Sequence, residues 1–281
     1  MTFKEAINKY MKYVKVTKSK GTYDFHIGNA KRLTAFFGEM NCEDIKRDQI
    51  LDLILYLKDK NNKISIATIN KYIGLLLRTL RNECNIDIKF DKLKEQKKMI
   101  SIVSHESIQK IFQHYEKMLY PEHLRNLVFF RILLDTGLRL SEILSLKVSN
   151  INFNDQSILA RKTKTKEDRL VFYTKPTEVF LNKYIINEKI TDHLFIDLNT
   201  RKILKIDRIQ KICQNLRKTL HIRESVTPHK WRHTFATQFN NQNGNLEVLR
   251  ILMGHSNILT TQRYLHINTQ KLRHEYFRVF E

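Results

Sequence analysis

Apolar residues recur every three or four positions through the N-terminal third of this chain, which is the spacing of one buried helix face. The first of these runs has Thr2 and Glu5 at the spacing of a capping box, which is typical of a helix start. The pattern predicts helices at 2–16, 22–38, 47–58 and 66–83. A small all-α domain is therefore expected over residues 1–88.

The charge of the chain favours a polyanionic partner. Lys and Arg number 50 against 29 Asp and Glu, for a formal net charge of +21, and the excess lies on both sides of residue 100. In a chain with this much apolar content, such an excess indicates nucleic acid rather than an acidic membrane surface. A generally lysine-rich composition would give the same excess, so charge alone leaves the function open.

Residues 89–103 interrupt the helical periodicity with a run of lysines around Leu93. They are predicted to form a basic interdomain linker, which would be either solvated or laid along a DNA backbone. Beyond it, the residues from Ser157 to Tyr173 predict a β-hairpin around a charged turn. Helices are predicted at 104–117, 122–136, 140–146, 176–188, 206–219, 228–240, 245–252 and 258–264.

The predicted fold is therefore mainly α, with a small β-sheet or hairpin in the C-terminal domain. A chain of 281 residues is long enough for two domains that each bury a core. The predicted division is a helical domain at 1–88, a linker at 89–103 and a mixed α+β domain at 104–281.

Neither a metal nor an exported location is expected. The three cysteines lie far apart without a C-x-x-C pair, and the 11 histidines include no H-E-x-x-H motif. The acidic pairs that two-metal nucleases need are not evident, so no cofactor is predicted. The N-terminus lacks the apolar core of a signal peptide, and no stretch reaches membrane-spanning length. The prediction is a cytoplasmic protein with free thiols.

Three segments carry residues suited to phosphate chemistry. The first is T-G-L-R-L-S-E at 136–142, where Gly137 allows a tight break after an apolar helix. Arg139 then lies near the electropositive end of the next helix and could hold a phosphate. A surface ion pair between Arg139 and Glu142 is the alternative.

The second segment is T-P-H-K-W-R-H-T at 227–234, which opens with a Thr-Pro pair typical of the N-cap and first position of a helix. His229, Arg232 and His233 follow at i, i+3 and i+4, so they share one helix face. Two of them could point at one phosphate, and the alternative is a set of surface cations in a basic protein.

The third segment is L-M-G-H-S-N-I-L-T-T-Q-R-Y at 252–264. A Gly-His turn precedes a short predicted helix, and Tyr264 follows His255 by nine residues. A lone tyrosine usually packs in a core, so this segment gains meaning only from its place after the other two.

Taken together, in this order and spacing, the segments resemble the catalytic domain of tyrosine recombinases and phage-type integrases, most closely the compact Xer type. The family pattern is an arginine, a lysine in a β-hairpin, His-x-x-Arg, a His or Trp after Gly, and a tyrosine. The resemblance covers 104–281 strongly, whereas the N-terminal helices match the family's core-binding domain in size and class only. The matching residues are Arg139, Lys164, His229, Arg232, His255 and Tyr264.

The resemblance implies a site-specific recombinase that cleaves and rejoins DNA through a 3′-phosphotyrosyl intermediate and a Holliday junction. Tyr264 would attack the phosphorus, and His229 would accept the phenol proton. Arg139 and Arg232 would clamp the non-bridging oxygens, because a guanidinium fork binds them bidentately and stays charged. His255 would add a hydrogen bond to the same phosphate.

The hairpin lysine would protonate the leaving 5′-oxygen. The turn offers Lys162, Lys164 and Lys166, and counting back from the strand that starts at Arg169 selects Lys164. The turn has threonines where close relatives often have glycines, so a shift of two residues stays open. Glu142 resembles the family's acidic residue that orients the network. The lysines assigned to DNA binding are Lys162, Lys166, Lys97, Lys98 and Lys230.

The resemblance also implies partners. The first is double-stranded DNA with an inverted-repeat core site. The protein would assemble on two such sites, either as a homotetramer or as a heterotetramer with a second recombinase. A regulatory protein would also be compatible. The last residues place Leu272, Tyr276 and Phe280 on one face of an amphipathic helix from about 268. This helix would either pack on its own domain or act as an exchange helix on a neighbouring protomer.

Two other functions would fit parts of the same pattern. A type IB topoisomerase-like enzyme would use similar residues as a monomer, but the compact helical domain and the C-terminal helix argue against it. A DNA-binding regulator that had lost activity would not need the complete set of catalytic residues. The sequence leaves open the DNA site, and whether the task is chromosome dimer resolution or the integration and excision of a mobile element.

Overall fold

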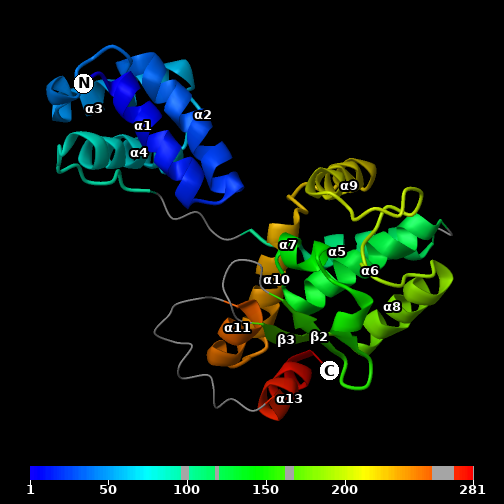
Figure 1. Ribbon diagram of the computed structural model, residues 1–281. Helices are drawn as coiled ribbons and strands as arrows, with labels where there is room; N and C mark the ends of the chain where they lie inside the picture. Colours follow the sequence, from blue (N-terminus) through cyan, green and yellow to red (C-terminus); the bar gives the residue numbers. More distant parts are fainter. Residues whose placement is uncertain (96–100, 118–119, 162–167, 255–268, 281) are drawn as a thin grey trace. The chain divides into compact units, whose positions relative to one another are not determined.

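The chain is mostly helical, in a computed structural model that describes residues 1–95, 101–117, 120–161, 168–254 and 269–280 (Figure 1). It divides into two compact units, Met1–Lys98 and Met99–Glu281, and each unit has its own hydrophobic core. The predicted fold class, mainly α with a small sheet, is confirmed. None of the described helices has the length and apolar character needed to cross a membrane.

The first unit consists of helices packed around one apolar core. Helix α1 (Phe3–Thr17) contacts both α2 (Lys20–Phe37) and α4 (Ile66–Cys84). The predicted capping box is present, because the Glu5 N–H donates to Thr2 Oγ1 at 3.3 Å and the Thr2 N–H donates to Glu5 Oε2 at 3.0 Å. The helices are α1 (Phe3–Thr17), α2 (Lys20–Phe37), α3 (Arg47–Lys60) and α4 (Ile66–Cys84), with a 3-10 turn at Cys42–Asp44.

The chain after α4 is fixed to the first unit by side-chain bonds to the backbone. The Leu93 N–H donates to Asn70 Oδ1 at 2.9 Å, and Asn70 Nδ2 donates to the Leu93 carbonyl at 3.0 Å. Phe90 is partly buried against the same core. At the other end of the predicted linker, Val103 is buried in the core of the second unit. Bonds of this kind leave no periodic signal in a sequence, which is why they were not predicted.

The second unit is built around α6 (Pro121–Thr136), which is buried on nearly every side from Arg125 onward. Its apolar run Leu127–Phe130 covers more than one face of the helix, which is typical of a helix inside a core. Helix α6 contacts α5 (His105–Glu116), α8 (Lys175–Asn187) and α10 (Pro228–Asn241). The remaining helical elements are α7 (Leu140–Leu144), a 3-10 turn at Val148–Asn150, α9 (Ile206–Thr219), α11 (Leu246–Met253) and α13 (Thr269–Phe280).

A small antiparallel sheet in the order β1-β2-β3 packs beside α6. The predicted hairpin corresponds to β2 (Ser157–Ala160) and β3 (Arg169–Phe172), and Ala160 pairs with Arg169. Strand β1 (Ile151–Asn152) was not predicted, because two residues are too few to show alternation. The register places a buried arginine at the start of β3.

The C-terminal helix α13 packs on its own unit, beside β3 (Figure 1). Its buried residues join a cluster with side chains of β3, α10 and α11, and they are Leu272, Tyr276 and Val279. The Tyr276 hydroxyl donates to the Asp135 carbonyl at the end of α6, at 2.9 Å. This agrees with the first of the two alternatives for the predicted helix, and docking on a neighbouring protomer stays a prediction.

Candidate active site

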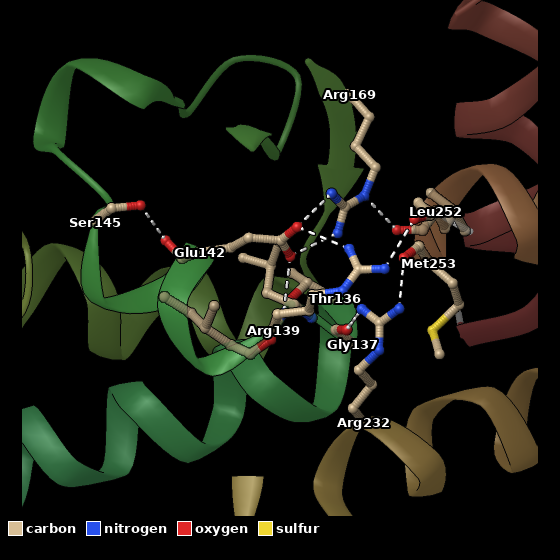
Figure 2. Close-up of polar contacts among 12 residues, drawn as sticks. Thr136, Gly137, Arg139, Glu142, Ser145, Arg169, Arg232, Leu252 and Met253 are labelled. Carbon is tan, nitrogen blue, oxygen red and sulfur yellow. Dashed lines mark hydrogen bonds and ion pairs between the residues drawn. The ribbon is translucent and has the colours of Figure 1, made fainter. Parts of the chain in front are cut away.

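Three arginines from different elements of the second unit meet at one place (Figure 2). Arg139 precedes α7, Arg169 begins β3 and Arg232 lies on α10. Figure 2 shows the three guanidiniums gathered between Glu142 and the C-terminal end of α11. Since these residues are distant in the sequence, only the packing of α6, α7, α10 and β3 brings them together.

Successive carbonyls at the end of α11 hold the guanidiniums in place. The last carbonyls of a helix have no partner inside it and carry the negative end of its dipole, so they are suited to cations. Each arginine uses a different one of these carbonyls. The bonds run from Arg169 Nε to Leu252 O at 2.7 Å, from Arg232 Nη2 to Met253 O at 2.5 Å and from Arg139 Nη2 to Gly254 O at 2.9 Å.

Glu142 is the anion of this cluster, with a side chain only 5% exposed. Its Oε1 accepts from Arg139 Nη1 and Arg169 Nη1, both at 3.0 Å. Its Oε2 accepts from the Arg139 backbone N–H at 2.8 Å and from Arg169 Nη2 at 2.9 Å. Burial alone would raise the pKa of Glu142, but the hydrogen bond and charge of Arg169, and then the bonds from Arg139, hold that pKa at about 2. The carboxylate is therefore ionised at neutral pH.

Arg232 is buried, with 6% of its surface exposed, so the alternative of a surface cation is wrong for this residue. In addition to its bond at the end of α11, its Nη1 donates to the Gly137 carbonyl. Burial, followed by the charges of Arg139 and Arg169, lowers the pKa of Arg232 to about 10. Arg232 thus keeps its charge at pH 7.

A pocket of about 500 Å³ opens beside these groups and is lined by Arg139, Arg232 and the exposed His229. His229 Nε2 lies 3.0 Å from Nε2 of His233, one helical turn further along α10, so one ring donates and the other accepts. The pKa of His233 is lowered by burial and by the nearby His229, Lys230 and Arg232. The pocket therefore combines two guanidiniums with a paired histidine.

Comparison with protein families gives two matches that together span most of the chain. Residues 101–271 match the phage integrase family, and residues 2–96 match the phage integrase SAM-like domain. The chain belongs to the phage integrase family. Because that family match covers more than half of the chain, the predicted resemblance is confirmed. The chain is a tyrosine recombinase similar to the Xer type, an enzyme of site-specific recombination that breaks and rejoins DNA.

Individual relatives agree with this assignment. Tyrosine recombinase XerA of Saccharolobus solfataricus is 34% identical over 212 residues, which are 75% of this chain and 67% of the relative. Tyrosine recombinase XerD of Oceanobacillus iheyensis is 26% identical over 294 aligned positions, an alignment that covers 96% of each chain. Among solved structures, the Tn1549 transposon integrase in complex with circular intermediate DNA has a TM-score of 0.76 at 20% identity, covering 98% of this chain and 99% of that one.

The structure of the recombinase brings four of the predicted site residues together: Arg139, Glu142, His229 and Arg232. Lys230 also lies on α10, next to His229 in sequence. The other predicted residues lie outside the described part of the chain, and they are Lys97, Lys98, Lys162, Lys164, Lys166, His255 and Tyr264. Within the described ranges, no three His, Cys, Asp or Glu side chains are grouped so that they could hold a metal ion.

Arg169 is a residue of the recombinase site that was not predicted from the sequence, where it marks the start of a strand. Alternation along the strand puts Arg169 on the same face as the apolar Val171, which predicts a buried position. A buried arginine needs an anionic or carbonyl partner, so this pattern signals a charge network, although it does not identify Glu142 as the partner.

The low pKa of Glu142 predicts an acid-sensitive recombinase fold. A carboxyl group whose pKa falls from 4.5 to about 2 on folding stabilises the fold above pH 4.5 and loses this effect as the pH falls toward 2. We expect Glu142→Gln to lower the free energy of unfolding by about 3 kcal/mol at pH 7, and the deficit to shrink between pH 4.5 and pH 2. Urea denaturation at several pH values measures this.

The matched control is Glu106→Gln, which removes an exposed carboxylate paired with Lys110. Exposed pairs contribute little, so its effect should stay within about 0.5 kcal/mol. A deficit for Glu142→Gln that did not change with pH would contradict the assigned role of the ionised carboxylate.

Gly137 ends α6 and presents its carbonyl to Arg232, and its φ of +60° is left-handed. A Cβ here would lie 2.4 Å from Phe235 Cδ1. We expect Gly137→Ala to lower the free energy of unfolding by about 2 to 4 kcal/mol, since both the backbone and the Phe235 ring are strained. Gly28→Ala is the control, because nothing lies within 4 Å of its Cβ position in α2, and it should gain about 0.5 to 1 kcal/mol. Chemical denaturation measures both changes in the free energy of unfolding, and changes of the same sign in the two variants would contradict this account.

Proposed function

We propose that this recombinase cuts and rejoins DNA through a 3′-phosphotyrosyl intermediate on Tyr264 and exchanges strands through a Holliday junction. The observation that carries the proposal is the pair of guanidiniums of Arg139 and Arg232 in one pocket with His229. A phosphodiester under attack gathers negative charge on its non-bridging oxygens, so fixed cations at that place are the main catalytic requirement.

The hydrogen bonds within the cluster leave donors for a phosphate. An arginine has five N–H donors, and in the described contacts the side chains of Arg139 and Arg232 each use two. Among the described contacts of the three guanidiniums, Glu142 supplies one negative charge, which leaves a net charge of two positive units there. The remaining N–H groups of the two pocket arginines would bind the non-bridging oxygens.

Proton transfer is assigned to the groups around this phosphate. His229 would accept the proton of Tyr264, and its protonated ring could then donate to His233, which lies 3.0 Å away. His255 would add a hydrogen bond to the phosphate. Lys164 would protonate the leaving 5′-oxygen, and the DNA backbone would be bound by Lys162, Lys166, Lys97, Lys98 and Lys230.

The proposed substrate is double-stranded DNA with an inverted-repeat core site. A lambda integrase dimer has been solved on a core site, with a TM-score of 0.72 at 16% identity. For this chain we infer a tetramer across two sites, formed by four copies or together with a second recombinase, with a regulatory protein as a further partner. The apolar face of α13 would then leave its own unit and dock on the same surface of a neighbouring protomer.

The test is covalent capture. The protein is incubated, without added metal, with a pool of nicked suicide duplexes from its source genome. In these, the short fragment that carries the free 5′-hydroxyl dissociates after cleavage, so the strand cannot be rejoined. We expect a denaturation-resistant adduct that maps to Tyr264. Tight binding without an adduct would contradict the proposal and favour a DNA-binding regulator. The captured sequences separate the two tasks, because dimer resolution predicts one chromosomal site and a mobile element predicts its own ends.

A further inference from the structure

Arg169 reaches from β3 into one side of the charge cluster (Figure 2), and it is buried. Its side chain is 6% exposed, and Glu142, to which it binds through both Nη atoms, is 5% exposed. Its Nε also donates to the Leu252 carbonyl at 2.7 Å. One guanidinium thus joins β3, the first turn of α7 and the end of α11. Its burial keeps it away from the pocket lining.

The bonds of Arg169 determine how Arg139 is used. Glu142 receives a two-pronged bond from Arg169, and only one side-chain bond from Arg139. If Arg169 were absent, the buried carboxylate would have Arg139 as its remaining cation and would draw the Arg139 guanidinium toward itself. Arg139 is 40% exposed and lines the pocket, so its guanidinium has room to turn further toward Glu142 once Arg169 is lost. Arg169 therefore leaves N–H donors of Arg139 available for a phosphate in the pocket.

Arg169 also fixes the end of α11. A Cβ at Gly254 would lie 2.9 Å from Arg169 Cζ, and Gly254 has a left-handed φ of +57°. The guanidinium is therefore packed against a backbone position that only glycine fits. The same backbone supplies the carbonyls that hold Arg139 and Arg232. A displacement of the Arg169 side chain would move both pocket arginines.

We propose that Arg169 is a positioning residue of this recombinase, which holds Glu142 and the end of α11 so that Arg139 can bind the scissile phosphate. The inference rests on the proposed function, since it concerns the same phosphate. No contact of Arg169 with DNA is involved, and its effect passes through Arg139.

The first test replaces the planar guanidinium of Arg169 and keeps its positive charge. Arg169→Lys has one compact ammonium group, which cannot bind both oxygens of Glu142 and the Leu252 carbonyl together. We expect single-turnover cleavage of a suicide duplex to slow by about 10- to 100-fold, with the Kd for DNA within about 3-fold of wild type. Arg201→Lys is the matched control, because the Arg201 guanidinium also donates through more than one nitrogen, in its case to two backbone carbonyls, but is exposed.

A second substrate separates positioning from loss of stability. In a duplex with a methylphosphonate at the scissile position, a neutral methyl group replaces one charged non-bridging oxygen. If Arg169 acts through Arg139 on that oxygen, the defect of Arg169→Lys relative to wild type should shrink to less than about 3-fold in one stereoisomer of this duplex. An equal defect on both stereoisomers and on the ordinary duplex would overturn the proposal.

Thermal unfolding shows whether Arg169→Lys folds. If it does not, the cleavage rates of Arg169→Gln relative to wild type are measured on the same ordinary and methylphosphonate duplexes, since its amide can still donate to Glu142. Cleavage at the wild-type rate by a folded variant would overturn the role of Arg169. Failure of the wild-type chain itself to form an adduct would instead contradict the proposed function, so the two failures are distinguishable.

Discussion

Replacing Tyr264 with phenylalanine is expected to abolish covalent capture of DNA and to leave DNA binding unchanged. The variant lacks only the hydroxyl that would attack the phosphorus, and no other nucleophile is assigned to the site. Binding rests on the phosphate contacts of cationic side chains, which the substitution does not touch. The measurement compares adduct formation on a nicked suicide duplex with the Kd from a binding titration at fixed salt.

A matched control for this experiment is Tyr120→Phe. Tyr120 is 66% exposed, so removal of its hydroxyl should change neither adduct formation nor binding. An adduct that forms at the wild-type rate in Tyr264→Phe would contradict the assignment of Tyr264 as the nucleophile. Loss of binding in the same variant would show that Tyr264 contributes to affinity, contrary to the proposal.

The second large effect is expected for Arg232→Lys, with cleavage slowed by about 100- to 1,000-fold. A lysine cannot donate to the Gly137 and Met253 carbonyls and also bind a phosphate oxygen in a fork. The burial and the neighbouring arginines that lower the pKa of Arg232 would also act on the lysine and lower its pKa toward neutral. Cleavage by the variant should therefore fall further as the pH rises, which single-turnover rates across a pH series would show.

Arg201→Lys is again the appropriate comparison, because Arg201 donates to the carbonyls of Glu188 and Lys189 on an exposed loop. Its cleavage rate should equal that of the wild type at every pH. If Arg232→Lys cleaved as fast as Arg201→Lys, the clamp role of Arg232 would have to be abandoned. If it lost binding and cleavage in the same proportion, Arg232 would serve affinity rather than the chemical step.

Much of the fold was predictable because its elements are encoded locally. The apolar period predicted α1 to α4, and Thr2 and Glu5 marked a helix start that the structure confirms. The strands of the hairpin also followed from short apolar runs on both sides of a charged turn. Strand β1 was missed because two residues are too few to show alternation, and the bonds between Asn70 and Leu93 were missed because they join residues 23 positions apart in the chain.

Local periodicity was enough to predict the helices and the hairpin, and the order of the three motifs, through the family resemblance, indicated Arg139 and Arg232 as phosphate-binding cations. The burial of Arg232 and the sharing of Glu142 between two arginines became visible only in the folded chain. The same holds for the link that Arg169 makes between β3 and the end of α11. Burial and charge pairing arise because elements distant in the sequence meet in the core, where a desolvated guanidinium must find a carboxylate or a free helix-end carbonyl.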